Sequence, residues 1–244
     1  MKTFTKIAAI GLTATLMATC FTACKINTPG KAIPSKKPEQ EQAIDEKDEK
    51  DGKSMVGGWS AAESTTVTEK QRQYFKDAIN PTNGYFYEPV ALLGTQVVSG
   101  VNYVFLCKST LDAKAGPKPM KLTYVYVNTS GEAKFMGDKN ITLPGTDGEQ
   151  KPGGWAYTKD PTVTEDIQKI VEKASQTRLG VNYEAIAYLG SQVVAGTNHA
   201  ILVKSTPVIK DSKGAVSFLI ITVYENLDGK CEITDTKDVN LNFG

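Results

Sequence analysis

The sequence has little of what several classes of function require. It contains a single histidine, His199, in 244 residues, and its formal net charge is +1. A balanced charge gives no long-range attraction to nucleic acid, so we expect no nucleic-acid partner. A lone histidine removes the commonest general base and leaves too few ligands for a histidine metal site. We therefore expect a protein that is not an enzyme, with no catalytic residues, no cofactor and no metal.

The apolar run near the N-terminus is too short for a good membrane span. Lys2 and Lys6 precede a mostly apolar stretch at 7–17, and small residues precede Cys24. This order is typical of an export signal, and the letters "FTAC" resemble the cleavage site of bacterial lipoproteins, in which the cysteine is lipidated. We expect a signal peptide over 1–23 and a lipid on Cys24 that anchors the exported protein to the bacterial cell envelope. The alternative is an ordinary secreted protein.

A polar segment follows the predicted signal. Residues 24–55 are rich in Lys, Glu, Asp and Pro and contain almost no large apolar side chains. Such a segment cannot bury enough surface to offset the entropy of ordering it. We expect a disordered tether that holds the rest of the chain away from the membrane.

The remainder of the chain is a duplication. "GTQVVSGVNYVFLCKST" at 94–110 returns as "GSQVVAGTNHAILVKST" at 190–206, an offset of 96 residues. We call the two copies repeat 1 and repeat 2. The pattern predicts one domain over 56–143 and a second over 152–244, joined by a linker at 144–151 made of turn formers and charges.

Only two cysteines remain outside the predicted export region. Cys107 and Cys231 occupy non-matching positions in the two repeats, so neither repeat can form an internal disulfide. The sequence leaves two alternatives: a disulfide between the repeats, or two separate thiols that pack as small apolar side chains.

Each repeat opens with one predicted helix. The letters "TVTE" occur at 66–69 and again at 162–165, and a threonine three residues before a glutamate is a capping-box signal. Apolar residues then follow at helical spacing in both copies: Tyr74, Phe75 and Ala78 in repeat 1, and Ile167, Ile170, Val171 and Ala174 in repeat 2.

The sequence after each helix is strand-like. It is rich in β-branched and aromatic residues and is interrupted by the turn sequences "NTSGE" at 128–132 and "NLDGK" at 226–230. This composition predicts antiparallel hairpins. We therefore predict an α+β fold of two tandem domains, each with one α-helix packed on a curved antiparallel sheet of about four strands.

Two valines before a glycine turn distinguish one hairpin in each repeat. Side chains alternate along a strand, so only one valine of each pair can face a core on the helix side. One interpretation is a strand end with one core valine and one incidental valine. The other is a binding tip whose valines are covered only by a partner.

These hairpins resemble the first binding hairpin of the cystatin and stefin superfamily, whose pattern is Gln, any residue, Val, any residue, Gly. Each lies about 38 residues after a glycine pair, Gly57 and Gly58 or Gly153 and Gly154, which matches the glycine of the family's N-terminal trunk. The resemblance covers nearly all of both repeats, and it implies two tandem cystatin-like domains.

The resemblance implies reversible inhibition of papain-like cysteine proteases, of a host or of other microbes. In this family a trunk and two hairpin tips form a non-covalent wedge that fills the protease cleft. The implied protease-binding residues, beside the two glycine pairs, are Gln96, Val97, Val98, Ser99 and Gly100, and Gln192, Val193, Val194, Ala195 and Gly196. We expect a monomer.

Two features keep a second class of function open. Secreted members of the family carry a Pro-Trp pair on the second hairpin, where this chain has "NTSGE" and "NLDGK". The linker also ties the trunk of repeat 2 to repeat 1, so we expect repeat 1 to be the stronger inhibitor. The alternative function is a non-inhibitory cystatin-fold module for binding or adhesion at the cell surface.

Overall fold

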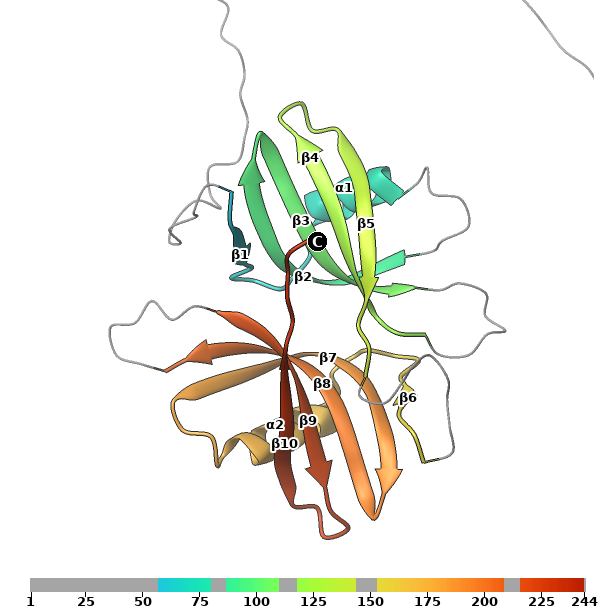
Figure 1. Ribbon diagram of the computed structural model, residues 1–244, viewed down its shortest axis with the longest axis vertical. Coiled ribbons are helices and arrows are strands. Elements are labelled where there is room, and N and C mark those ends of the chain that lie inside the picture. Colours follow the sequence, from blue (N-terminus) through green and yellow to red (C-terminus); the bar gives the residue numbers. More distant parts are fainter. Residues whose placement is uncertain (1–56, 80–86, 110–117, 144–152, 209–215, 244) are drawn as a thin grey trace, which may run out of the picture. The chain divides into compact units, whose positions relative to one another are not determined.

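The first sheet is built entirely from repeat 1 (Figure 1). The computed structural model describes residues 57–79, 87–109, 118–143, 153–208 and 216–243. The sheet has five antiparallel strands in the order β1-β2-β3-β4-β5, with one helix, α1, between β1 and β2 in the chain. The bounds are β1 (Trp59–Ala61), α1 (Glu69–Ile79), β2 (Tyr87–Val98), β3 (Gly100–Ser109), β4 (Lys121–Asn128) and β5 (Ala133–Asn140).

The second sheet repeats this arrangement with the residues of repeat 2. Its five antiparallel strands have the order β10-β9-β8-β7-β6, and α2 follows β6 in the chain. The bounds are β6 (Ala156–Tyr157), α2 (Glu165–Ser175), β7 (Val181–Val194), β8 (Gly196–Pro207), β9 (Ser217–Glu225) and β10 (Cys231–Asp238). The predicted duplication therefore extends to the order and pairing of the strands.

Both helices occur where the sequence predicts them, but their caps lie two residues later. Thr68 Oγ1 accepts from the backbone nitrogen of Gln71, whose side chain accepts from the Thr68 nitrogen at 2.9 Å. In α2 the N-cap is Thr164, which accepts from the nitrogen of Ile167 at 3.4 Å. Thr162, the predicted cap, instead donates to the carboxylate of Asp160. The glutamates of both "TVTE" stretches are the first helical residues.

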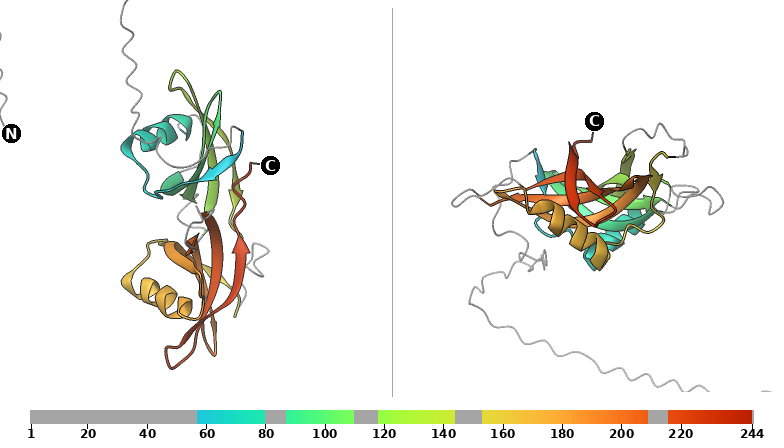
Figure 2. Two further views of the ribbon diagram at one scale, coloured as in Figure 1. Left: turned by 90° about the vertical axis from the view of Figure 1, so that its left-hand side faces the viewer. Right: turned by 90° about the horizontal axis from the view of Figure 1, so that it is seen from below.

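Each helix packs on one face of its own sheet (Figure 2). In repeat 1, Phe75 of α1 contacts Phe105 of β3 edge to face, with ring centroids 5.2 Å apart. In repeat 2 the apolar side of α2 packs against the middle strands of the second sheet. The buried members of this second cluster are Ile167, Ile170, Val171, Ala174, Ile201, Val203, Ile221, Val223 and Ile233.

The faces turned away from the helices form a single shared core. It joins residues of β2, β3 and β4 to residues of β7, β8 and β9, including Leu93, Leu106, Leu189 and Leu202. Apolar side chains alternate between this core and the helix-side cores: Val104 and Leu106 face the shared core, whereas Phe105 and Cys107 face α1. The described residues of both repeats accordingly belong to one compact unit.

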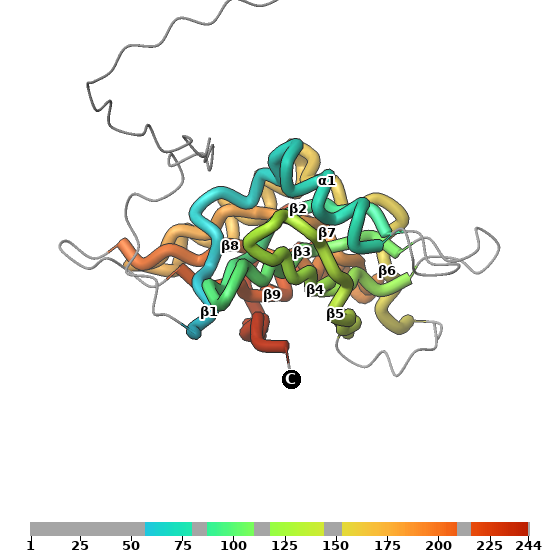
Figure 3. The backbone as a smooth tube through the Cα atoms, turned by 90° about the horizontal axis from the view of Figure 1, so that it is seen from above, coloured from blue at the N-terminus to red at the C-terminus, as the bar shows by residue number. Residues whose placement is uncertain are grey.

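Two short segments beyond the last strands reach across to the other repeat. Leu143, which follows β5, lies against Gly190 of β7, and Leu241, which follows β10, lies against Gly94 of β2. The carbonyl of Asn242 also accepts from the Tyr124 hydroxyl at 3.3 Å. Residues 241–243 therefore lie beside the first sheet (Figure 3).

The prediction of an α+β fold with two tandem domains was wrong, because the two sheets share one core. The described residues are mostly strand, in two five-stranded sheets, and each repeat has only one helix of 11 residues. The fifth strand of each sheet, β1 or β6, has only three or two residues, too few for a periodic pattern. The shared core requires contacts between the repeats, which no local sequence pattern contains.

Several predictions lie outside the described residues. They are the signal peptide over 1–23, the tether over 24–55 with lipidation at Cys24, and the linker at 144–151. Among the residues that the structure describes, no helix is both long and apolar enough to cross a membrane.

Candidate functional site

The β2–β3 hairpin of repeat 1 and the β7–β8 hairpin of repeat 2 each turn through a single residue. Val98 pairs with Gly100 around Ser99, and Val194 pairs with Gly196 around Ala195. Gly100 has φ 140° and Gly196 has φ 122°, where side chains are disfavoured. A Cβ on Gly100 would also overlap the carbonyl oxygen of Val127. The turn therefore requires glycine both for its backbone angle and for the close approach of the neighbouring strand.

The valines at these tips lie outside the core. Val97 and Val98 are 41% and 39% exposed, and Val193 and Val194 are 74% and 44% exposed. Both members of each pair are exposed although alternation points them to opposite sides of the sheet. The hairpins extend past the ends of the helix-side and shared cores, so the interpretation with one core valine per pair does not hold.

The glutamine of each hairpin holds the glycine pair in place. Gln96 Nε2 donates to the carbonyl of Gly57 at 2.9 Å, and Gln96 Oε1 accepts from Asn102 Nδ2 at 2.7 Å. The backbone nitrogen of Gly57 also donates to the carbonyl of Val97 at 3.3 Å. The glycine pair of repeat 1, Gly57 and Gly58, therefore lies beside the hairpin tip.

Repeat 2 makes the same side-chain bridge. Gln192 Nε2 donates to the carbonyl of Gly153 at 3.0 Å and Gln192 Oε1 accepts from Asn198 Nδ2 at 2.9 Å, so Gly153 and Gly154 lie beside this tip as well. The predicted site did not include the two asparagines, Asn102 and Asn198. Their recurrence at the same offset in both copies was a usable signal.

The tryptophans after the glycine pairs are packing residues. Trp155 is 7% exposed within the shared core, and Trp59 packs against that core. The Trp59 ring meets the Tyr124 ring edge to face at 5.8 Å. These contacts fix the strand that follows each glycine pair.

The second turn of each sheet lies next to the first tip. Tyr126 of β4 donates from its hydroxyl to the carbonyl of Ser99 at 2.8 Å, and Tyr224 of β9 donates to the carbonyl of Ala195 at 2.5 Å. These strands lead into the turns at 128–132 and 226–230. Glycine pair, first hairpin and second turn therefore lie together at one end of each sheet. Neither tyrosine could be recognised from the sequence, because both contacts join residues far apart in the chain.

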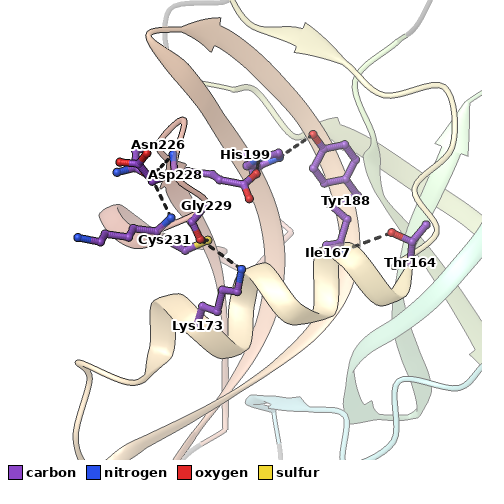
Figure 4. Close-up of polar contacts among 11 residues, drawn as sticks. Thr164, Ile167, Lys173, Tyr188, His199, Asn226, Asp228, Gly229 and Cys231 are labelled. Carbon is purple, nitrogen blue, oxygen red and sulfur yellow. Dashed lines mark hydrogen bonds and ion pairs between the residues drawn. The ribbon is translucent and has the colours of Figure 1, made fainter.

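A histidine beside the tip distinguishes repeat 2. His199 Nδ1 lies 3.1 Å from the Tyr188 hydroxyl (Figure 4). His199 Nε2 lies 3.3 Å from the Glu225 carboxylate. Burial raises the pKa of Tyr188 above its ordinary value. The residues of repeat 1 that match His199, Tyr188 and Glu225 are Tyr103, Leu92 and Val127, in that order. Tyr188 and Glu225 therefore provide polar partners for both nitrogens of the largely buried His199 imidazole. Among the described residues, no group of three or more His, Cys, Asp or Glu side chains could hold a metal ion.

The two cysteines are separate thiols. Cys107 is fully buried, and Cys231 is partly exposed. Burial raises the pKa of the Cys107 thiol far above its ordinary value and also raises the pKa of Cys231. A thiol with a raised pKa is a poor nucleophile at neutral pH, so neither cysteine has the environment of a reactive centre.

Comparisons with known proteins do not assign the chain to a family. No protein-family model matches it, and a search of curated proteins finds no match.

Proposed function

We propose that the protein is a reversible inhibitor of papain-like cysteine proteases and that it belongs to the cystatin and stefin superfamily. The observation that carries this proposal is the grouping at one end of each sheet. A glycine pair, two exposed valines and a second turn are held together there by the bonds of Gln96 and Tyr126 in repeat 1 and of Gln192 and Tyr224 in repeat 2.

The physical action is that of a preorganised wedge. The hydrogen bonds fix the three segments before any partner arrives, so little conformational entropy is lost on binding. The valines contribute apolar area that becomes favourable only when a cleft covers it, on the order of 1.5 kcal/mol for each side chain that is fully buried. The glycines allow the backbone to approach a partner closely.

The inhibitor acts outside the cytoplasm. An export signal over 1–23 and a lipid on Cys24 would anchor it to the cell envelope, and residues 24–55 would carry the two sheets away from the membrane surface. The proteases that it meets there are those of a host or of neighbouring microbes.

An inhibition assay with papain tests this function. The wild-type chain should lower papain activity reversibly, whereas a variant with Val97, Val98, Val193 and Val194 all replaced by Asp should inhibit at least 100-fold less well. All four side chains are exposed, so these changes spare the core.

The matched control replaces apolar side chains away from the tips. Leu179 and Val208 are 94% and 67% exposed, and they flank the end of the β7–β8 pair opposite to the tip, where Val181 pairs with Pro207. Replacing both with Asp should leave inhibition unchanged. Binding of papain without inhibition would instead support the adhesion or binding module.

A further inference from the structure

The second turns of the two repeats share one backbone scaffold. The side-chain oxygen of Asn128 accepts from the nitrogens of Ser130 and Glu132 at 3.0 and 2.9 Å. Asn226 accepts from Asp228 and Lys230 at the same two distances. Gly131 and Gly229, with φ 83° and 74°, complete the turns. The scaffold is a rigid support for the residue that follows each asparagine.

That residue differs between the repeats. Repeat 1 presents Thr129 and repeat 2 presents Leu227, whose side chain is 86% exposed. A leucine held almost fully in solvent by an ordered turn is unfavourable unless a partner covers it. Leu227 belongs to the same end of the second sheet as Val193 and Val194, because Tyr224, three residues earlier, bonds to the tip carbonyl of Ala195.

A bond from the helix further fixes the turn of repeat 2. Lys173 of α2 donates from Nζ to the carbonyl of Gly229 at 3.2 Å (Figure 4). The matching helix residue of repeat 1 is Asp77, whose carboxylate accepts from Gln73 within the helix at 2.8 Å. The turn that carries Leu227 is therefore held by the bonds of Asn226 within the turn and by the bond from Lys173 of α2.

We propose that Leu227 is the apolar anchor of the second turn and makes the end of repeat 2 the tighter protease-binding site. This inference rests on the proposed function, and it identifies Leu227 as the residue that makes one end bind the protease more tightly than the other. It reverses the order that the linker alone predicts. The bulk of Leu227, with Val193 and Val194, supplies three apolar side chains at one end, whereas Thr129 leaves repeat 1 with its two valines.

The test uses full-length chains in which only one end remains competent. In a chain with Val97→Asp and Val98→Asp, the end of repeat 2 acts alone, and Leu227→Thr should raise the inhibition constant for papain by about 10- to 100-fold. In the reciprocal chain with Val193→Asp and Val194→Asp, Thr129→Leu should lower the inhibition constant. Leu179→Thr in the first chain is the matched control and should have no effect, because Leu179 is 94% exposed near the opposite end of the β7–β8 pair.

The outcomes separate this inference from the function on which it depends. If both one-ended chains inhibit papain but Leu227→Thr changes the inhibition constant less than twofold, the inference is wrong and the proposed function stands. If the chain with repeat 1 competent inhibits more tightly than its reciprocal, the ranking is also overturned. If the wild-type chain does not inhibit papain at all, the proposed function fails and the inference falls with it.

Discussion

The side-chain amide of Gln96 donates to the backbone carbonyl of Gly57 over 2.9 Å, a bond that spans 39 positions of the chain. It ties the segment before β1 to the tip of the first hairpin, and Gln192 ties Gly153 in the same way. A bond between an exposed side chain and a backbone carbonyl contributes little to stability. Its effect is to hold two parts of the candidate site in one orientation.

Removing these glutamines should weaken inhibition without unfolding the protein. In a chain with Gln96→Ala and Gln192→Ala, we expect the inhibition constant for papain to rise about 10-fold, because both glycine pairs must then be ordered on binding. The melting temperature should change little. Gln73→Ala, which removes an exposed hydrogen bond within α1, is the control and should alter neither quantity. An unchanged inhibition constant in the double variant would argue against preorganised trunks.

Gly94 and Gly190 should tolerate no side chain. A Cβ on Gly94 would lie 2.7 Å from the carbonyl oxygen of Ser60 and 2.9 Å from a methyl group of Leu241. We expect Gly94→Ala to lower the free energy of unfolding by about 2–4 kcal/mol through overpacking, measured by urea denaturation. Gly180, with φ 84° and open space around it, is the comparison, and Gly180→Ala should cost only about 1 kcal/mol.

The C-terminal segment should stabilise the first sheet. Leu241 packs against the shared core, and the ring of Phe243 lies 4.7 Å from the ring of Tyr124. A chain that ends at Asn240 should therefore lose about 3 kcal/mol of stability relative to one that ends at Phe243. Because Trp59 contacts Tyr124, tryptophan fluorescence should report the loss. Equal unfolding midpoints for the two chains would contradict the claim that Leu241 and Phe243 stabilise the protein by packing against the first sheet.

The two thiols should differ in reactivity. Burial holds the pKa of Cys107 far above its ordinary value, and the pKa of Cys231 is raised by burial and by the charge of Glu225. A raised pKa leaves less thiolate at a given pH. Iodoacetamide at pH 8 should therefore modify Cys231 slowly in the native protein and Cys107 only after denaturation, as peptide mass spectrometry can measure. Alkylation of native Cys107 at the rate of Cys231 would contradict its burial.

Sequence patterns predicted those parts of the fold that depend on interactions between residues close together in the chain. The helices follow from apolar spacing and nearby caps, and the hairpin tips follow from glycines whose backbone angles few other residues adopt. Strands β1 and β6 could not be predicted from the sequence, and neither could the segments that follow β5 and β10. All of them are short and are stabilised by residues far away in the sequence. Leu143 and Leu241, for example, find their partners in the opposite repeat.

The candidate site divides in the same way. Gly100, Val98 and Gln96 could be selected from a five-residue pattern repeated 96 positions later. Tyr126 could not, because its bond to Ser99 joins two hairpins of the folded sheet. The turn that carries Leu227 could be predicted, but the 86% exposure of its side chain could not, because exposure depends on which distant parts of the chain approach the turn.

An active-site titration of papain tests the central claim most directly. With papain well above the inhibition constant, increasing amounts of the purified chain should reduce activity linearly to an endpoint of one chain for two papain molecules, because each repeat has a complete glycine pair and hairpin tip. The inhibitor should be recovered uncleaved. Full papain activity at micromolar concentrations of the chain would contradict the account.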